Sequence, residues 1–263
     1  MNIGLIIIGD EILSGRRQDK HLAKVIEILG ARGLQLAWAR YVGDDRPLIT
    51  QALRDAFASG DLVFSCGGIG ATPDDHTRAC AAEALGLPLE LHPQAKALIL
   101  ERMRDVAREQ GQPFDPDRAD NLHRLNMGVF PQGSRLIPNP YNKIPGFAVH
   151  HVHFVPGFPV MAWPMIEAVL DGDYAHLRGG ATPRERSVIV MGSMEATLTP
   201  LMIEIEQRFP AVRVFSLPSV DHPQWGRHID LGVKGRQEVD EAFAALREGL
   251  VRLGVTLGPE LVR

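Results

Sequence analysis

Glycines and acidic residues occur together in three loops that each follow a short apolar run. The loops lie at 9–15 (GDEILSG), 42–47 (VGDDRP) and 66–77 (CGGIGATPDDHT). Glycine allows a ligand to approach the backbone closely, and carboxylates can hold a divalent cation. Because ligands of an open parallel sheet bind beyond the carboxyl ends of its strands, we expect these loops to form the binding site.

The loop at 66–77 carries the strongest pattern. Gly67, Gly68 and Gly70 lead from a buried strand into a helix, and free N–H groups at such a turn bind anions such as phosphate. The loop is not a Walker A motif because no Gly-Lys-Ser/Thr follows, and it lacks the GxGxxG spacing of dinucleotide-binding folds. In an alternative interpretation, 72–75 (TPDD) is a capping box with Pro73 at the first helical position.

Carboxylates beside a phosphate-binding loop repel the phosphate unless a cation lies between them. Asp10, Asp44 and Asp75 lie in the three loops, and together they predict a site for Mg²⁺, which takes few carboxylates plus substrate phosphate oxygens. The alternatives are that Asp10 faces water in a polar turn, and that one of Asp44 and Asp45 caps the following helix.

Four further residues of metal-binding or nucleophilic type are interpreted as structural. His150, His151 and His153 lie at the turn between two short predicted strands, which favours a solvated hairpin over a metal site. Cys66 ends a buried strand and has no identifiable catalytic base, which favours packing in the core.

The spacing of apolar residues predicts the elements that position these loops. Strands and helices alternate in the first half, and this order is typical of an α/β doubly wound sheet with right-handed crossovers. The predicted strands are 3–8, 35–42 and 61–66, and the helices are 20–31 with Asp19 as N-cap, 48–58, 74–85 and 93–110. Short strands at 147–150 and 153–155 and a helix at 160–170 follow.

A second, smaller layer is predicted after a linker at 171–185, which is rich in Gly, Asp and Pro. Its elements are a strand at 186–191, a helix at 195–209, strands at 212–217 and 228–233, and a helix at 238–253. The order of these elements is βαββα, which predicts a separate small α/β domain.

Composition excludes several classes of protein. The chain has 263 residues, of which 45% are hydrophobic and 23% charged, so it is not disordered. Its formal net charge of −4 offers no basic field to nucleic acid or an anionic membrane. Asp10 and Glu11 interrupt the N-terminal apolar run, and no later stretch is long enough to cross a bilayer. Two cysteines without CxxC spacing fit a reducing compartment, so we expect a cytoplasmic protein.

Six motifs together resemble a known family. GDEILSG, QDK, VGDD, GGIGATPDDHT, NPYNKIPGF and VPGFP follow the order found in the molybdopterin-binding fold shared by MogA, MoaB and the N-terminal half of CinA. The resemblance implies a three-layer α/β/α domain with a mixed sheet at 1–175, and a second, smaller CinA-type α/β domain at 186–256. The C-terminal amidase domain of CinA has no counterpart here, so nicotinamide-nucleotide deamidation is not expected.

The resemblance implies binding of a phosphorylated pterin or an ADP-containing nucleotide together with Mg²⁺. The leading expectation is metal-dependent hydrolysis of a pyrophosphate bond in substrates such as ADP-ribose or FAD. Adenylylation of molybdopterin in molybdenum cofactor biosynthesis is an alternative, and a non-catalytic pterin- or nucleotide-binding module is another. Relatives commonly self-associate, so we expect a homo-oligomer whose partners are small molecules rather than nucleic acid or membrane.

The same resemblance assigns roles to individual residues. Asp44 and Asp75 match the aspartates considered catalytic in MogA-type proteins, and with Asp10 they are expected to hold the metal. The residues expected to bind the ligand or its phosphate are Ser14, Asp19, Gly67, Gly68, Gly70, Thr72, Thr77 and Gly157. Lys143 is hypothesised to add a phosphate contact. The chain departs from the family pattern at Met127, Ala71, Asn142-Lys143 and Val160, which the motifs place at the edge of the pocket.

Overall fold

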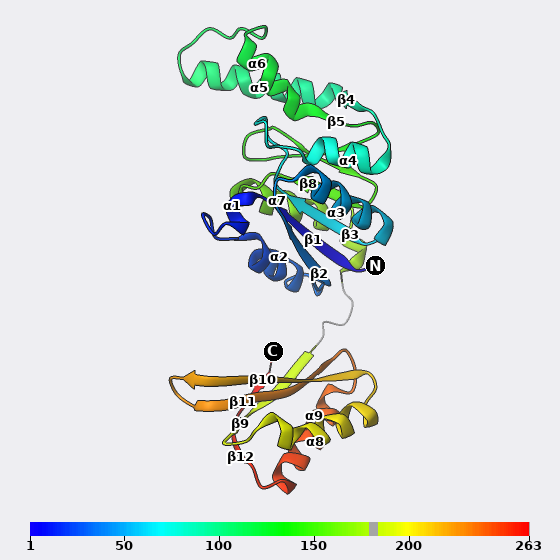
Figure 1. Cartoon of the computed structure of the whole chain (residues 1–263), viewed down its shortest axis with the longest axis vertical. Coiled ribbons are helices and arrows are strands. Elements are labelled where there is room, and N and C mark those ends of the chain that lie inside the picture. Colours follow the sequence, from blue (N-terminus) through cyan, green and yellow to red (C-terminus); the bar gives the residue numbers. More distant parts are fainter. Residues whose placement is uncertain (179–183, 263) are drawn as a thin grey trace. The chain divides into compact units, whose positions relative to one another are not determined.

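The computed structural model describes residues 1–178 and 184–262 (Figure 1). The chain divides into two compact units, Met1–Arg178 and Gly179–Arg263, and each is described by itself. Of the predicted linker at 171–185, residues 179–183 lie outside the described residues.

The first unit is built on a six-stranded mixed sheet with the order β2-β1-β3-β8-β7-β6. The pairs β1–β2, β1–β3 and β3–β8 are parallel, whereas β7 pairs antiparallel with both β8 and β6. The strands are β1 (Ile3–Ile8), β2 (Trp38–Val42), β3 (Leu62–Cys66), β6 (Arg135–Ile137), β7 (Gly146–Val149) and β8 (Val152–Val155). The parallel part of the sheet therefore ends at the loops that carry the glycines and aspartates.

Helices connect these strands. They are α1 (Asp10–Leu13), α2 (His21–Gly30), α3 (Arg46–Ser59), α4 (Thr77–Leu85), α5 (Pro93–Glu109), α6 (Ala119–Arg124) and α7 (Pro159–Asp171). The Asp45 carboxylate caps α3 by accepting a hydrogen bond from the Leu48 N–H, and Gly60 ends the helix in the left-handed conformation. The predicted helix at 74–85 begins later, at Thr77, because 72–75 form a separate turn.

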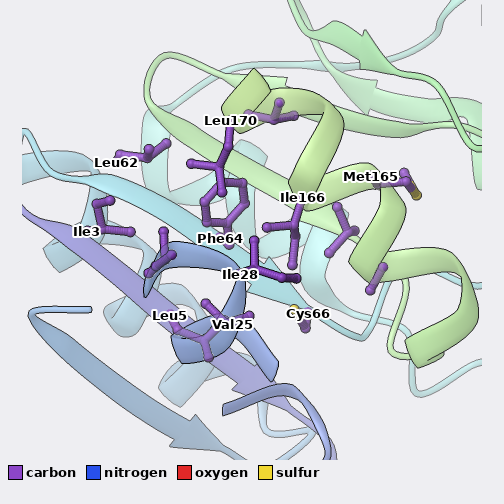
Figure 2. Close-up of a cluster of buried hydrophobic side chains, with 14 of the residues drawn as sticks. Ile3, Leu5, Val25, Ile28, Leu62, Phe64, Cys66, Met165, Ile166 and Leu170 are labelled. Atoms are coloured by element: carbon purple, nitrogen blue, oxygen red, sulfur yellow. The ribbon is translucent and has the colours of Figure 1, made fainter. Parts of the chain in front are cut away.

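Both faces of the sheet are buried, which makes the unit three-layered. Ile3, Leu5 and Ile7 of β1 pack with α2 and α7, while Ile6 and Ile8 pack with α3 and α4 on the opposite face. Figure 2 shows the first cluster, in which Val25 and Ile28 of α2 and Ile166 of α7 meet the strands. The sequences of β1 and β3 are therefore continuous, almost wholly apolar runs, as expected for the centre of a parallel core.

Between α4 and β6 the chain makes an excursion that the apolar pattern only partly predicts. Two short strands, β4 (Leu89–Leu91) and β5 (Val129–Pro131), pair antiparallel, and they enclose α5, α6 and a 3₁₀ turn, η1 (Leu125–Gly128). In Figure 1 this excursion lies at one end of the first unit, beyond the main sheet. The packing of Phe130 of β5 against Phe147 of β7, with ring centroids 4.6 Å apart, joins it to the core.

The predicted hairpin at the histidines is confirmed, but one of its histidines is not solvated. His150 adopts a left-handed conformation in the turn between β7 and β8 and is exposed. His153 on β8 is fully buried, and its ring lies against Phe64 at a centroid distance of 5.5 Å. Residue 153 points inward because its neighbours on β8, 152 and 154, fill the opposite face.

The second unit is a four-stranded antiparallel sheet covered on one face by two helices. Its sheet order is β10-β11-β9-β12, and its elements are β9 (Arg184–Met191), α8 (Glu195–Arg208), β10 (Val212–His222), β11 (Gly226–Gly235), α9 (Val239–Arg252) and β12 (Thr256–Val262). The βαββα order is confirmed, and β12, which pairs with β9 across an irregularity between Leu257 and Glu260, was not predicted. In the described part of the chain, no helix combines the length and the hydropathy needed to cross a membrane.

Candidate functional site

A cavity of about 450 Å³ lies in the first unit, where the loops after β1, β2, β3 and β8 meet. Seven of the predicted site residues line this cavity: Asp44, Gly67, Gly68, Gly70, Thr72, Asp75 and Gly157. The structure therefore brings the strand-end loops together around one cavity, as the sequence predicts. The cavity volume lies within the range typical of small-molecule sites.

The loop after β3 needs glycine for steric reasons. Gly67 and Gly68 have φ angles of 107° and 67°, which disfavour any other residue. A Cβ atom on Gly67 would collide with the carbonyl of Ile8, and one on Gly68 would collide with the Thr77 hydroxyl. The backbone of this loop therefore packs directly against β1 and the start of α4.

Three consecutive residues of this loop present free backbone donors. Gly68, Ile69 and Gly70 line the cavity, and in the described part of the chain their N–H groups donate no hydrogen bond. Unpaired backbone N–H groups next to a helix N-terminus form an anion-binding concavity. The arrangement suits a phosphate group.

Asp75 is fixed at one side of this loop by Thr72. Its Oδ2 accepts hydrogen bonds from the backbone N–H of Thr72 at 2.8 Å and from the Thr72 hydroxyl at 2.5 Å. The carboxylate lies close to Gly70, since a Cβ atom there would be 2.6 Å from Oδ2. The bond from the Thr72 N–H is one that a capping box also makes, but here it closes a separate turn at 72–75. Because α4 begins only at Thr77, after His76, the alternative in which TPDD caps this helix is wrong.

Asp44 faces the same cavity and is held by Asp10. The Asp44 carboxylate accepts a hydrogen bond from the Asp10 N–H at 2.8 Å, and the Asp10 carboxylate accepts one from the Asp44 N–H at 3.1 Å. Partial burial raises the pKa of Asp44, and the negative charges of Asp10, Glu11 and Asp74 add to this increase. A cation bound here would relieve that repulsion.

The residues present fit Mg²⁺ held jointly by protein and substrate. Within residues 1–178 and 184–262, no three His, Cys, Asp or Glu side chains are grouped to hold a metal. Asp44 and Asp75 nevertheless line the same cavity and supply two carboxylates. Mg²⁺ commonly takes one or two carboxylates and fills its remaining positions with water and substrate phosphate oxygens.

Other predicted residues support the cavity from outside. Thr77 is fully buried, and its hydroxyl donates to the carbonyl of Gly67 at 3.0 Å, so the expected ligand contact of Thr77 is corrected to a loop contact. The carboxylate of Asp19 accepts hydrogen bonds from the N–H groups of His21 and Leu22, which confirms that Asp19 caps α2. Ser14 is exposed, and neither Ser14 nor Asp19 lines the cavity.

Lys143 does not reach the cavity. Its ammonium lies 2.6 Å from Oε1 of Glu101 and 2.7 Å from Oδ2 of Asp105, both on α5. Lys143 also has a left-handed backbone conformation, with φ of 67°, which turns the loop at this position. The hypothesised phosphate contact is therefore corrected to an ion pair between this loop and α5.

Sequence reasoning missed Asn139 and Arg17. Asn139 is buried, and its amide holds the loop before β7 by donating to Asn142 Oδ1 at 2.8 Å and to the carbonyl of Ile144 at 3.0 Å. Arg17 follows the first loop, lines the cavity and pairs with Glu11 at 3.9 Å. The NPYNKIPGF motif contains Asn139, whereas nothing in the pattern distinguishes Arg17 from a solvated arginine.

A second cavity of about 310 Å³ adjoins the first. The two share five lining residues, Ile8, Glu11, Arg17, Gly157 and Phe158. Nε2 of His21 lies 3.0 Å from the carbonyl of Gly157 and so ties the start of α2 to this common wall. Gln18 and Lys20 line only the second cavity. The site therefore offers two adjacent compartments.

Comparison with known proteins agrees with this geometry. The sequence model described as "Probable molybdopterin binding domain" matches residues 4–176. A protein of Caldivirga maquilingensis is 32% identical over 210 residues, covering 78% of this chain and 76% of that protein. A CinA-like protein of Syntrophotalea carbinolica is 29% identical over 72% of this chain, which spans only 44% of that relative.

A solved structure with the same fold comes from Thermoplasma acidophilum. It is described as the protein CinA with unknown function, is 32% identical, and superimposes with a TM-score of 0.53 over 65% of this chain and 96% of that one. The family match covers residues 4–176 of the first unit, including every loop of the cavity. The chain therefore belongs to the family of molybdopterin binding domains, with a CinA-related first unit.

Proposed function

We propose that the first unit binds a phosphorylated pterin or adenine nucleotide with Mg²⁺ and hydrolyses a pyrophosphate bond of an ADP-ribose-like or FAD-like substrate. The observation that carries this proposal is that Asp44, Asp75 and three free backbone N–H groups share one cavity. A diphosphate needs both donors for its oxygens and a cation for its charge, and this cavity offers the groups for each.

The proposed roles follow from the positions of the groups. The N–H groups of Gly68, Ile69 and Gly70 hold phosphate oxygens and stabilise the charge that develops on them. Mg²⁺, when bound by Asp44 and Asp75, would supply Lewis-acid activation of a phosphoryl oxygen and of water. Water oxygen bonds to one phosphorus, the bridging P–O bond breaks, and two monophosphates form. The proton lost by the water passes through a neighbouring carboxylate to solvent.

The test is release of AMP from ADP-ribose, FAD or ATP in the presence of Mg²⁺. We expect the unaltered protein to release AMP from a diphosphate-bridged substrate, and Asp75→Asn to lower kcat about 100-fold because it removes a charged metal ligand. The amide of Asp75→Asn still accepts the Thr72 N–H bond, so the turn is retained. Asp117→Asn, at an exposed position outside the cavity, is the matched control.

Absence of AMP release from all three substrates would contradict hydrolysis. Tight pterin binding that survives removal of the metal would then favour the non-catalytic module. A rate in Asp75→Asn equal to that of Asp117→Asn would contradict the role of Asp75.

Adenylylation of a pterin phosphate is the second candidate, and the adjoining 310 Å³ cavity favours it. Transfer of AMP from ATP requires that a nucleotide and an acceptor lie side by side, and two compartments with a common wall provide that room. Pterin-dependent release of pyrophosphate from ATP distinguishes this reaction from hydrolysis, which needs no acceptor.

A further inference from the structure

Two neighbouring residues of α4 hold three consecutive carbonyl groups of the cavity loop. The Thr77 hydroxyl donates to the carbonyl of Gly67, and the Thr77 N–H donates to the carbonyl of Gly68, each at 3.0 Å. Nη1 of Arg78 donates to the carbonyl of Ile69. All three carbonyls are therefore directed toward the start of α4.

This arrangement fixes the direction of the three N–H groups that follow. In a trans peptide, the N–H of each residue points opposite to the carbonyl of the residue before it, and the chain has no cis peptide in its described residues. Holding the carbonyls of Gly67, Gly68 and Ile69 from α4 thus directs the N–H groups of Gly68, Ile69 and Gly70 away from α4. These are the three unpaired donors that line the cavity.

Arg78 differs from the other cationic side chains near the cavity because it is buried. It is only 9% exposed, whereas the side chain of Arg17, on the cavity wall, is 66% exposed. A charge this deeply buried is costly unless it is paired and hydrogen-bonded. The charge of Asp75 acts on Arg78, so this guanidinium also offsets a carboxylate that would otherwise repel an anion at Gly70.

We propose that Arg78 is a positioning residue that holds the Ile69–Gly70 peptide with its N–H toward the cavity. Together with Thr77, which holds the two preceding peptides, it thereby creates the anion-binding loop. Arg78 acts on a phosphate through the backbone and does not line the cavity itself. The inference rests on the anion-binding part of the proposed function and is independent of whether a bond is cleaved.

The first experiment measures the loop without any ligand. Residual dipolar couplings report the orientation of the Gly70 N–H vector, and we compare the unaltered chain with Arg78→Met and Arg78→Lys. We expect Arg78→Met to change the Gly70 coupling, and Arg78→Lys to keep it near its original value because an ammonium can still donate to the Ile69 carbonyl. Arg108→Met, at an 82% exposed side chain on α5, controls for loss of a guanidinium.

The second experiment measures the affinity for inorganic pyrophosphate and, separately, for adenosine. We expect Arg78→Met to weaken pyrophosphate binding about tenfold and to leave adenosine binding unchanged, because only the anion uses the loop donors. A general collapse of the cavity would weaken both probes equally, and that result would overturn the proposal.

An unchanged Gly70 coupling in a folded Arg78→Met protein would also overturn the proposal. If Arg78→Met does not fold, Thr77→Val provides the same test on the Gly67 carbonyl, with Gly68 as the reporting N–H. If the unaltered protein binds no pyrophosphate, anion binding and the proposed function fail, whereas the dipolar couplings still decide whether Arg78 orients the peptide.

Discussion

Nε2 of His123 lies 2.6 Å from the backbone carbonyl of Ala71. His123 belongs to α6, in the excursion between β4 and β5, and Ala71 belongs to the cavity loop after β3. A carbonyl can only accept, so Nε2 carries the hydrogen, and Nδ1 faces Nδ2 of Asn126 at 3.4 Å. The excursion thus contacts the loop that carries the free N–H groups.

Removal of this contact is expected to weaken ligand binding. His123→Ala should raise the Kd for a phosphate-containing nucleotide about fivefold, because one hydrogen bond that restrains the loop is lost. Isothermal titration calorimetry provides the measurement, and His150→Ala, in the exposed turn between β7 and β8, is the control. Equal affinities of the two variants would show that the excursion does not restrain the loop.

Mg²⁺ binding should depend on pH through Asp44. The pKa of Asp44 is raised, first by partial burial and then by neighbouring negative charges, so its carboxylate gains a proton at a higher pH than an ordinary aspartate. Metal binding requires the charged form, and Mg²⁺ affinity is therefore expected to fall as pH decreases through this raised value. Asp10→Asn removes one of these neighbouring charges and should move the midpoint of this pH dependence to lower pH. An unchanged midpoint, measured by titrating Mg²⁺ at a series of pH values, would contradict this role of Asp44.

Lys143 and Arg17 should have different effects on anion binding. Lys143→Ala removes an exposed ion pair with Glu101 and Asp105 and should leave pyrophosphate affinity unchanged. Arg17→Ala removes a cation from the wall of both cavities and should weaken pyrophosphate binding about threefold. A loss of affinity in Lys143→Ala equal to that in Arg17→Ala would restore the phosphate contact hypothesised for Lys143.

His153 should make the first unit sensitive to acid. Burial, together with the charge of Arg135, lowers the pKa of His153 from 6.5 to about 4. Between pH 6.5 and 4, the unfolded chain therefore binds a proton on His153, whereas the folded chain does not. Stability is retained above pH 6.5 and is lost as pH falls from 6.5 toward 4, by about 3 kcal/mol at most.

His153→Phe keeps an aromatic ring between Phe64 and Tyr174 and removes the titrating group. The variant is expected to show a flatter dependence of the unfolding free energy on pH between 6.5 and 4, measured by urea denaturation. His150→Phe, in the exposed turn, should retain the original slope. A slope in His153→Phe equal to that of the unaltered chain would show that another group controls acid sensitivity.

The apolar periodicity predicted the parallel core well, because β1 and β3 are buried on both faces and their sequences are continuous apolar runs. It predicted the start of α4 less well, because the Asp75 carboxylate binds back to Thr72 and leaves 72–75 in a turn. Both interpretations of TPDD use the same residues, and only the observed hydrogen bonds distinguish them.

Membership of the candidate site was predictable for residues such as Gly68 and Asp44, which lie in loops that directly follow a strand. The loops that follow the parallel strands all lie at the same edge of the sheet. Site membership was not predictable for Lys143 and Arg78, whose roles depend on how the chain folds back on itself. Lys143 contacts α5, 38 and 42 positions earlier, and Arg78 meets the Ile69 carbonyl only because the loop folds back over α4.

Each of the two units has a hydrophobic core of its own. Heat is therefore expected to unfold the chain in two steps, and a ligand of the cavity should raise the temperature of only the step that belongs to the first unit. At 100 times its Kd, a ligand stabilises the state that binds it by about 2.7 kcal/mol. In scanning calorimetry with and without ligand, the unfolding step of the second unit thus serves as an internal reference. A shift of the first step reports binding, and an unshifted second step in the same sample is the control.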